Sequence, residues 1–289
     1  MEIERVGVVG CGLMGSGIAE AVARAGVDVR IVELDRDALD QGRARVTRSI
    51  ARAEKAGKLT GPEADAAQGR MHFSTDMGSL GDRQLVVEAI MESEPEKLAI
   101  FEMLDRVLEA DDAILASNTS SIPIMKLAMA TKRPAQVIGI HFFNPVPVLP
   151  LVELVTSLLT SDEVASNADR FVTDQLDKRV IRSQDRAGFI VNALLIPYLL
   201  SAVRMLESGF ATAQDIDTGM VNGCAHPMGP LALADLIGLD TTVAVADSLY
   251  QEFKEPLYAP PPLLARMVEA GLLGRKSGRG FYHYPSSTK

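Results

Sequence analysis

Short apolar runs alternate with longer amphipathic stretches through the first two thirds of the chain. The runs are rich in β-branched residues and end at glycine or polar residues, which is typical of buried strands. They predict strands at 5–9, 27–32, 84–90, 113–117, 137–141 and 151–155, with helices at 16–25, 37–58 and 97–108. Strands that alternate with helices indicate a mostly parallel sheet with helices on both faces.

The pattern changes near residue 186 and is helical from Gly188 almost to the end. Gly209 ends one predicted helix, and Thr212 begins the next through a capping-box sequence that reaches Asp215. The predicted fold class is therefore α/β, with a doubly wound N-terminal sheet followed by an all-helical C-terminal domain. We place the boundary between residues 183 and 188, which gives domains 1–186 and 187–289.

A glycine-rich loop follows the first predicted strand and opens a helix: Gly10-Cys11-Gly12-Leu13-Met14-Gly15. In this context the first glycine allows a tight turn, the second lets a pyrophosphate approach the backbone, and the third lets helix and strand pack closely. The pyrophosphate would then lie at the positive end of the helix. The sequence therefore predicts a Rossmann-like dinucleotide-binding domain at 1–186.

Glu33 ends the second predicted strand and indicates which dinucleotide is bound. An acid there can accept hydrogen bonds from both ribose hydroxyls of NAD and would repel the 2′-phosphate of NADP. Arg36 is close enough in sequence to leave some NADP activity open. FAD uses similar glycine loops, but nothing else in the chain suggests a flavin. An ordinary solvated charge at a strand end is the alternative for Glu33.

Polar residues also follow two later strands, where loops line the ligand crevice of such sheets. One group is Ser117-Asn118-Thr119-Ser120-Ser121, which can also cap the next helix. The other is His141, with Glu153 one short loop downstream. A carboxylate bonded to one imidazole nitrogen fixes the tautomer and stabilises the imidazolium, so the pair suits a general base. Glu153 lies between Val152 and Leu154, however, and could instead be an outward-facing charge on a half-exposed strand.

Composition and charge exclude several classes of protein. Hydrophobic residues make up 47% and charged residues 23% of the 289 residues, as in a globular protein. The net charge of −9 makes nucleic acid an improbable partner. The two cysteines, Cys11 and Cys224, form neither a disulfide framework nor a metal site. Neither a secretory leader nor a membrane span is evident, since the most apolar stretch, 189–205, contains polar residues, so we expect a cytoplasmic protein.

In these motifs the chain resembles the L-3-hydroxyacyl-CoA dehydrogenase family, most closely its single-function bacterial members of the mycobacterial type. The resemblance spans the whole chain, and its motifs are the glycine loop, Val87-Glu88-Ala89-Ile90, Ser117-Asn118-Thr119-Ser120-Ser121, His141-Phe142-Phe143-Asn144-Pro145, Leu151-Val152-Glu153, Gly188-Phe189-Ile190-Val191-Asn192, His226-Pro227-Met228-Gly229-Pro230 and residues 274–282. Glu33 stands where most members carry aspartate.

The resemblance implies NAD-dependent oxidation of a short (3S)-3-hydroxyacyl-CoA, or the reverse reduction. His141 matches the general acid/base and Glu153 its partner, while Ser120 and Asn192 match the residues that bind the reacting oxygen. Matching cofactor contacts are Gly10, Gly12, Leu13, Met14, Gly15, Glu33, Glu92, Lys97, Asn144 and Lys276.

The resemblance also implies an acyl-CoA substrate and a homodimer formed through domain 187–289. Arg45, Arg48, Arg52 and Lys55 are spaced to share one helix face, and the family binds its substrate along this helix. Ser49, Arg52 and Lys55 are the expected contacts, with a solvated basic helix as the alternative.

Two other functions stay open. A related dehydrogenase of a sugar acid, of the gulonate type, would use the same fold with other substrate contacts. A non-enzymatic NADH-binding or structural protein would keep the fold without the chemistry, although the presence of Ser120, His141, Glu153 and Asn192 disfavours it.

Overall fold

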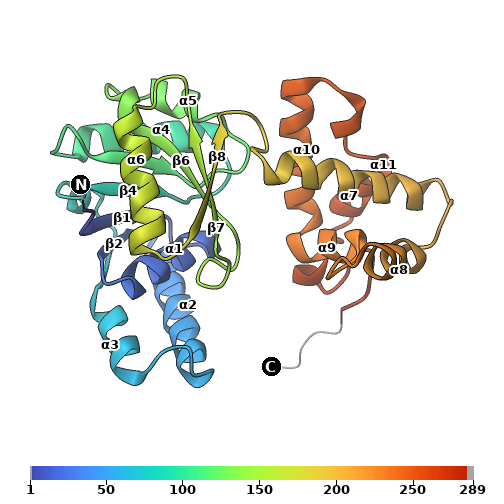
Figure 1. The fold of residues 1–289 in the computed structure, drawn as a ribbon, viewed down its shortest axis with the longest axis horizontal. Coiled ribbons are helices and arrows are strands. Elements are labelled where there is room, and N and C mark those ends of the chain that lie inside the picture. Colours follow the sequence, from blue (N-terminus) through green and yellow to red (C-terminus); the bar gives the residue numbers. More distant parts are fainter. Residues whose placement is uncertain (1, 285–289) are drawn as a thin grey trace. The chain divides into compact units, whose positions relative to one another are not determined.

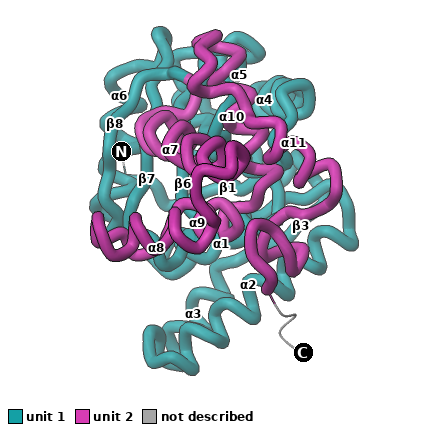
Figure 2. The backbone as a smooth tube through the Cα atoms, turned by 90° about the vertical axis from the view of Figure 1, so that its right-hand side faces the viewer, with its two compact units in different colours: residues 1–186 teal, residues 187–289 magenta. Residues whose placement is uncertain are grey.

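The computed structural model describes residues 2–284 (Figure 1). The chain divides into two compact units, Met1–Arg186 and Ala187–Lys289 (Figure 2). This division falls inside the interval in which the sequence pattern changes.

The first unit is built on one sheet of eight strands in the order β3-β2-β1-β4-β5-β6-β7-β8. The strands are β1 (Arg5–Val9), β2 (Asp28–Val32), β3 (Met71–Ser74), β4 (Leu85–Glu88), β5 (Ile114–Ser117), β6 (Val137–Phe142), β7 (Leu151–Thr156) and β8 (Arg179–Gln184). Neighbours are parallel except β6 and β7, which are antiparallel, so β7 and β8 run against the other six. The predicted fold class of a mostly parallel, doubly wound sheet is confirmed.

Six α-helices and three shorter helical segments connect the strands. They are α1 (Leu13–Arg24), α2 (Arg36–Lys55), α3 (Gly61–Gly69), η1 (Met77–Leu80), α4 (Glu94–Val107), α5 (Ile124–Met129), η2 (Pro134–Gln136), α6 (Asp162–Arg170) and η3 (Phe171–Gln175). Side chains cap the N-termini of several helices. Asp35 accepts from the Ala38 N–H at the start of α2, and Thr60 forms a capping box with Glu63 at the start of α3. The sequence pattern had indicated neither α3, β3, α6 nor β8.

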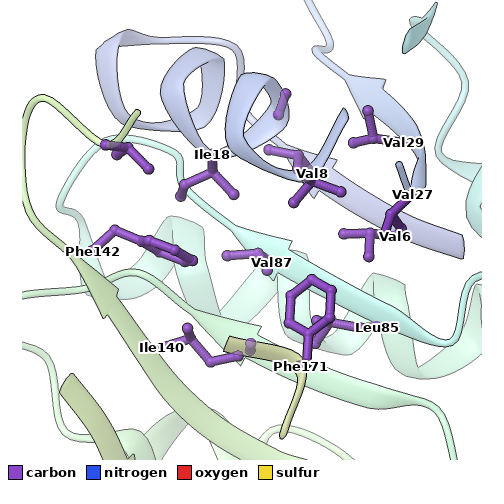
Figure 3. Packing of buried hydrophobic residues seen from close by; sticks show 14 of the residues in the cluster. Val6, Val8, Ile18, Val27, Val29, Leu85, Val87, Ile140, Phe142 and Phe171 are labelled. Atoms are coloured by element: carbon purple, nitrogen blue, oxygen red, sulfur yellow. The ribbon is translucent and has the colours of Figure 1, made fainter. Parts of the chain in front are cut away.

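The core of this unit lies where α1 and α6 cover one face of the sheet. Ile18 of α1 and Phe171 at the end of α6 join Val8, Val87 and Ile140 from three strands in one buried cluster (Figure 3). Burying each such side chain stabilises the fold by about 1.5–3 kcal/mol. The central strands are buried on both faces, which explains why they are continuous apolar runs in the sequence.

The second unit is helical, as predicted. Its elements are α7 (Val191–Glu207), α8 (Ala213–Cys224), α9 (Pro230–Ile237), α10 (Leu239–Phe253), η4 (Pro256–Tyr258), α11 (Pro262–Glu269) and η5 (Arg275–Ser277). Thr212 caps α8 as its sequence predicts, accepting from the Asp215 N–H. The buried Asp217 accepts from the N–H groups of Leu231 and Ala232 and so holds the start of α9. Among residues 2–284, no helix is long and apolar enough to cross a membrane.

Candidate active site

The carboxyl ends of β1, β4, β5 and β6 lie along one edge of the sheet, because these strands are mutually parallel. The loop that begins at Gly10 follows β1, Glu88 ends β4, Ser117 ends β5, and His141 is the penultimate residue of β6. Ligands of doubly wound sheets bind along this edge. The sequence therefore concentrates its polar groups where the fold places a crevice.

Backbone geometry explains the three glycines of the loop. Gly10 has a φ of +93°, and a Cβ there would lie 2.7 Å from the Ala89 carbonyl oxygen. A Cβ on Gly15 would lie 2.0 Å from the Gly10 carbonyl oxygen, whereas a Cβ on Gly12 would meet nothing within 4 Å. The loop is thus packed against the protein at Gly10 and Gly15 and open at Gly12, as a pyrophosphate that approaches the backbone requires. Leu13 and Met14 begin α1 beside this opening.

Cys11 of the loop is a buried packing residue. It lies against α2, where even a Cβ on Gly42 would come within 2.2 Å of its sulfur. Burial raises the pKa of the Cys11 thiol, and the hydrogen-bond contact with Ser16 opposes this shift only in part. A raised pKa keeps the thiol protonated, so Cys11 does not provide a reactive thiolate.

A cavity of about 480 Å³ opens beside the glycine loop. Its lining is mainly apolar and comes from Val9, Gly10, Gly12, Val32, Glu33, Leu34, Ala89, Ile90, Met91, Glu96, Ala99, Ile100 and Met103. Glu33 is its acid at the end of β2, and the carboxylate accepts hydrogen bonds from the N–H groups of Cys11 (3.0 Å) and Leu34 (3.1 Å). These bonds hold both carboxylate oxygens at the mouth of the cavity. The residues fit a dinucleotide, with an apolar slot for its base and an acid for a ribose.

His141 and Glu153 face each other across the antiparallel pair β6–β7. They are directly opposed in register, and His141 Nδ1 lies 2.7 Å from Glu153 Oε2. Both side chains are buried, with Glu153 fully inaccessible. The alternative of an outward charge on a half-exposed strand is wrong, because Glu153 has no exposed surface and β8 extends the sheet beyond β7. The chemistry of this pair is that of an imidazole oriented by a carboxylate.

Ser120 lies in the loop after β5, and Glu92 organises this loop. Glu92 Oε1 accepts from Thr119 Oγ1 (2.6 Å), from the N–H groups of Ser120 (3.0 Å) and Ser121 (3.2 Å), and from Ser121 Oγ (2.8 Å). Burial opposes ionisation of Glu92, but the charge of Lys97 and these hydrogen bonds outweigh it and lower the pKa of Glu92. An ionised Glu92 therefore fixes the backbone on both sides of Ser120.

Lys97 is almost fully enclosed near the loop, with 1% of its side chain exposed. Its Nζ lies 2.6 Å from Glu88 Oε1 and 3.3 Å from Glu92 Oε2. Asn144, by contrast, is exposed in the loop that follows β6.

One of the four basic residues that were expected to share a face of α2 is placed differently by the structure. Ser49 is half-buried, and Arg52 and Lys55 are exposed. Arg45 is turned to the glycine loop, where it donates to the Cys11 carbonyl (2.8 Å) and to Ser16 Oγ (3.3 Å). Arg45 thus braces the cofactor loop, and the expectation that it shares an open basic face is not met.

Asn192 and Lys276 belong to the second unit. Asn192 is the second residue of α7 and is partly exposed. Lys276 pairs with Asp240 at 2.6 Å.

Comparison with known proteins decides the family. Residues 5–186 match the NAD-binding domain of 3-hydroxyacyl-CoA dehydrogenases, and residues 188–284 match the C-terminal domain of the same enzymes. The chain belongs to the 3-hydroxyacyl-CoA dehydrogenase family. Its first unit is accordingly an NAD-binding domain, in agreement with the glycine loop and Glu33.

Individual members of the family are similar along the whole chain. A 3-hydroxybutyryl-CoA dehydrogenase of Mycobacterium tuberculosis is 60% identical over 98% of this chain and 99% of its own length. The crystal structure of M. tuberculosis FadB2 superposes with a TM-score of 0.97 at 59% identity, covering 98% of this chain and all of that one. That of (S)-3-hydroxybutyryl-CoA dehydrogenase from Ralstonia eutropha gives 0.93 at 44% identity, covering 99% and 100%.

The roles of Glu88 and Ser117 were not predicted from the sequence. Glu88 stood out only as part of a family motif and Ser117 only as one of the polar residues after a strand, yet both side chains are fully buried and hydrogen-bonded to each other at 2.6 Å. The available signal was an acid within the apolar run that ends β4, followed nine residues later by a lysine. A charge in a buried strand needs a partner, and the lysine supplies it.

Proposed function

We propose that the protein catalyses the NAD-dependent oxidation of short-chain (3S)-3-hydroxyacyl-CoA, with 3-hydroxybutyryl-CoA and acetoacetyl-CoA as its reactant pair, and the reverse reduction. The observation that carries the proposal is the buried His141–Glu153 pair, which lies at the carboxyl end of β6 in an NAD-binding domain. The 60% identical M. tuberculosis relative, itself named a 3-hydroxybutyryl-CoA dehydrogenase, supports the choice of substrate.

His141 acts as the acid/base in this mechanism. Its Nδ1 is engaged by Glu153, so Nε2 is the nitrogen that takes the hydroxyl proton during oxidation and returns a proton to the ketone oxygen during reduction. Glu153 holds the ring and offsets the positive charge that it acquires. NAD, when bound, accepts the hydride from C3 of the substrate.

Ser120 and Asn192 position the reacting oxygen and stabilise the charge that develops on it. Ser120 is supported for this role by the loop geometry that Glu92 imposes. Asn192 is proposed on its motif in the second unit. Gly10, Gly12, Leu13, Met14, Gly15 and Glu33 hold the dinucleotide, with Glu92, Lys97, Asn144 and Lys276 as further contacts.

The coenzyme A portion binds along α2. Its phosphates need cations, and the exposed Arg52 and Lys55 provide two. Ser49, on the same helix, would add a hydrogen-bond donor. The chain as a whole has a net charge of −9, so binding of the phosphates depends on local cations such as these.

We also propose a cytoplasmic homodimer that assembles through the second unit. Several large apolar side chains are exposed there, among them Phe210 at 80%, Leu194 and Leu257. Exposed aromatic and aliphatic groups of this size are typical of surfaces that pair. Cys11 and Cys224 are both free thiols, which suits a reducing compartment. Sedimentation equilibrium should give twice the chain mass of 31.0 kDa, and a monomer would contradict the assembly.

The deciding experiment is NADH oxidation with acetoacetyl-CoA, run beside NADPH and beside free acetoacetate. We expect rapid turnover that needs both the thioester and NADH. Equal turnover of the free acid would contradict the acyl-CoA assignment and favour a sugar-acid dehydrogenase. Binding of NADH without turnover of any such substrate would favour a non-enzymatic role.

A further inference from the structure

Three charged side chains, two of them buried, form a cluster at the carboxyl end of β4. Glu88 has no exposed surface, Lys97 has 1%, and Glu92 retains 34%. Lys97 Nζ lies between the two carboxylates, 2.6 Å from Glu88 and 3.3 Å from Glu92. One ammonium group therefore serves two acids, and the formal charge of the cluster is −1.

Glu88 holds the cluster to the strand edge. Its Oε1 accepts from Lys97 and from the Ile90 N–H (2.7 Å), and its Oε2 accepts from Ser117 Oγ (2.6 Å). Ser117 Oγ in turn accepts from the Thr119 N–H at 3.1 Å. Both oxygens of the Glu88 carboxylate are thus hydrogen-bonded to groups of the protein.

These bonds close into a ring around the start of the Ser120 loop. Thr119 Oγ1 donates to Glu92 at 2.6 Å, Glu92 pairs with Lys97, and Lys97 pairs with Glu88. A ring of charge-assisted bonds in a buried setting keeps its members in place. The excess negative charge is therefore fixed next to Ser120 and does not relax away from it.

The position of this charge matters for the cofactor. In the proposed mechanism Ser120 and His141 act on one substrate oxygen, so the nicotinamide of a bound NAD would lie near that oxygen and near the cluster. The nicotinamide ring carries a positive charge when oxidised and none when reduced. A fixed negative charge in a poorly solvated site therefore interacts differently with the two forms.

We propose that Glu88 is a positioning residue whose buried carboxylate, together with Glu92 and Lys97, biases the site toward the oxidised, positively charged nicotinamide. The inference rests on the proposed function, because it requires the nicotinamide beside Ser120 and His141. Glu88 acts through the charge of its carboxylate and does not itself touch the substrate.

The test compares the affinities of the full-length protein for NAD⁺ and for NADH, measured separately by calorimetry without substrate. In Glu88→Gln, which keeps the shape and removes the charge, the ratio of the NAD⁺ to the NADH dissociation constant should rise about fivefold, a value typical of a modest coupling between charges. Glu92→Gln removes the same charge from a partly exposed position and should shift the ratio in the same direction. It keeps the test decisive if Glu88→Gln does not fold.

Ser117→Ala is the matched control. It cuts the bond from Glu88 to the loop and leaves the three charges in place, so turnover should fall while the ratio of affinities stays that of the wild type. Equal weakening of NAD⁺ and NADH in the two glutamine variants would overturn the proposal and leave Glu88 a purely structural role. A wild-type protein that binds neither dinucleotide would instead refute the proposed function itself.

Discussion

The side-chain oxygen of Asn118 accepts a hydrogen bond from the backbone N–H of Phe142 at 2.9 Å. This bond joins the loop that carries Ser120 to the strand that carries His141. The distance between the proposed hydroxyl donor and the proposed base is therefore constrained by a bond from the Asn118 side chain to the backbone of β6.

Replacing Asn118 by alanine should separate these two groups without removing either. We expect kcat to fall about 10- to 100-fold, because displacements near 1 Å at a reacting centre cost rates of this order. Steady-state kinetics with acetoacetyl-CoA would measure the loss. Asn118→Asp, which keeps the acceptor oxygen, should recover much of the rate; equal loss in both variants would contradict a positioning role.

His141→Ala should lower kcat by about 100-fold or more, the usual contribution of a general acid/base. Affinity for NADH should stay near the wild-type value, because the ring is engaged by Glu153 and not by the glycine loop. Glu153→Gln should reduce turnover as well, since the amide cannot offset an imidazolium charge. A near-normal rate in His141→Ala would show that another group is the base.

Glu33→Gln should weaken the discrimination between NADH and NADPH. The carboxylate is held by the Cys11 and Leu34 N–H groups, so the variant loses the repulsion of a 2′-phosphate while its amide oxygen can still accept from one of these two N–H groups. We expect the ratio of kcat/KM for NADH over NADPH to drop about tenfold, equivalent to about 1.4 kcal/mol. Glu96→Gln, another acid of the same cavity, is the control and should leave the ratio unchanged.

Arg52→Ala and Lys55→Ala should raise KM for acetoacetyl-CoA and leave kcat nearly unchanged, since binding far from the reacting carbon is common to ground and transition states. The pantetheine thioester lacks the nucleotide phosphates, so its KM should not respond. Exposed charges contribute modestly, and a three- to tenfold increase is expected, roughly 1 kcal/mol. A matching increase with the pantetheine thioester would place the coenzyme A nucleotide elsewhere.

Acid should destabilise the first unit partly through Glu92. Its pKa is lowered in the folded protein, so the stability it contributes is fully present above the unfolded pKa of about 4.3 and is lost as the pH falls through the lower folded value. The difference in melting temperature between wild type and Glu92→Gln should thus shrink on acidification below about pH 4. Glu94→Gln, which breaks the exposed pair with Lys126, should change little at any pH.

The central sheet could be predicted because its strands are buried on both faces and are therefore continuous apolar runs. β8 could not, since its sequence Arg179–Gln184 has only two apolar residues, Val180 and Ile181, and the strand lies at an edge of the sheet without a buried residue. α3 was equally hidden, because only Ala64 and Ala67 are buried in it and it has almost no apolar face. Without β8, β7 could have been an edge strand, which left the surroundings of Glu153 open.

The site was predictable where a side chain follows a strand and obscure where it depends on tertiary partners. The glycine loop, Glu33 and His141 are marked by their places at strand ends. The burial of Lys97 was not evident, because a lysine on an amphipathic helix is ordinarily solvated and only the packed structure brings Glu88 and Glu92 to it.

The alternation of side chains along β7 makes the His141–Glu153 pair sensitive to the number of residues that precede Glu153 in the strand. Successive side chains of a strand point to opposite faces, so inserting one residue between Leu151 and Glu153 would turn the carboxylate to the other face of the sheet, whereas two inserted residues would return it to the original face one step out of register. The connecting loop 143–150 can change length without this penalty. Natural and engineered length variation should therefore be tolerated before Leu151 and rejected immediately after it.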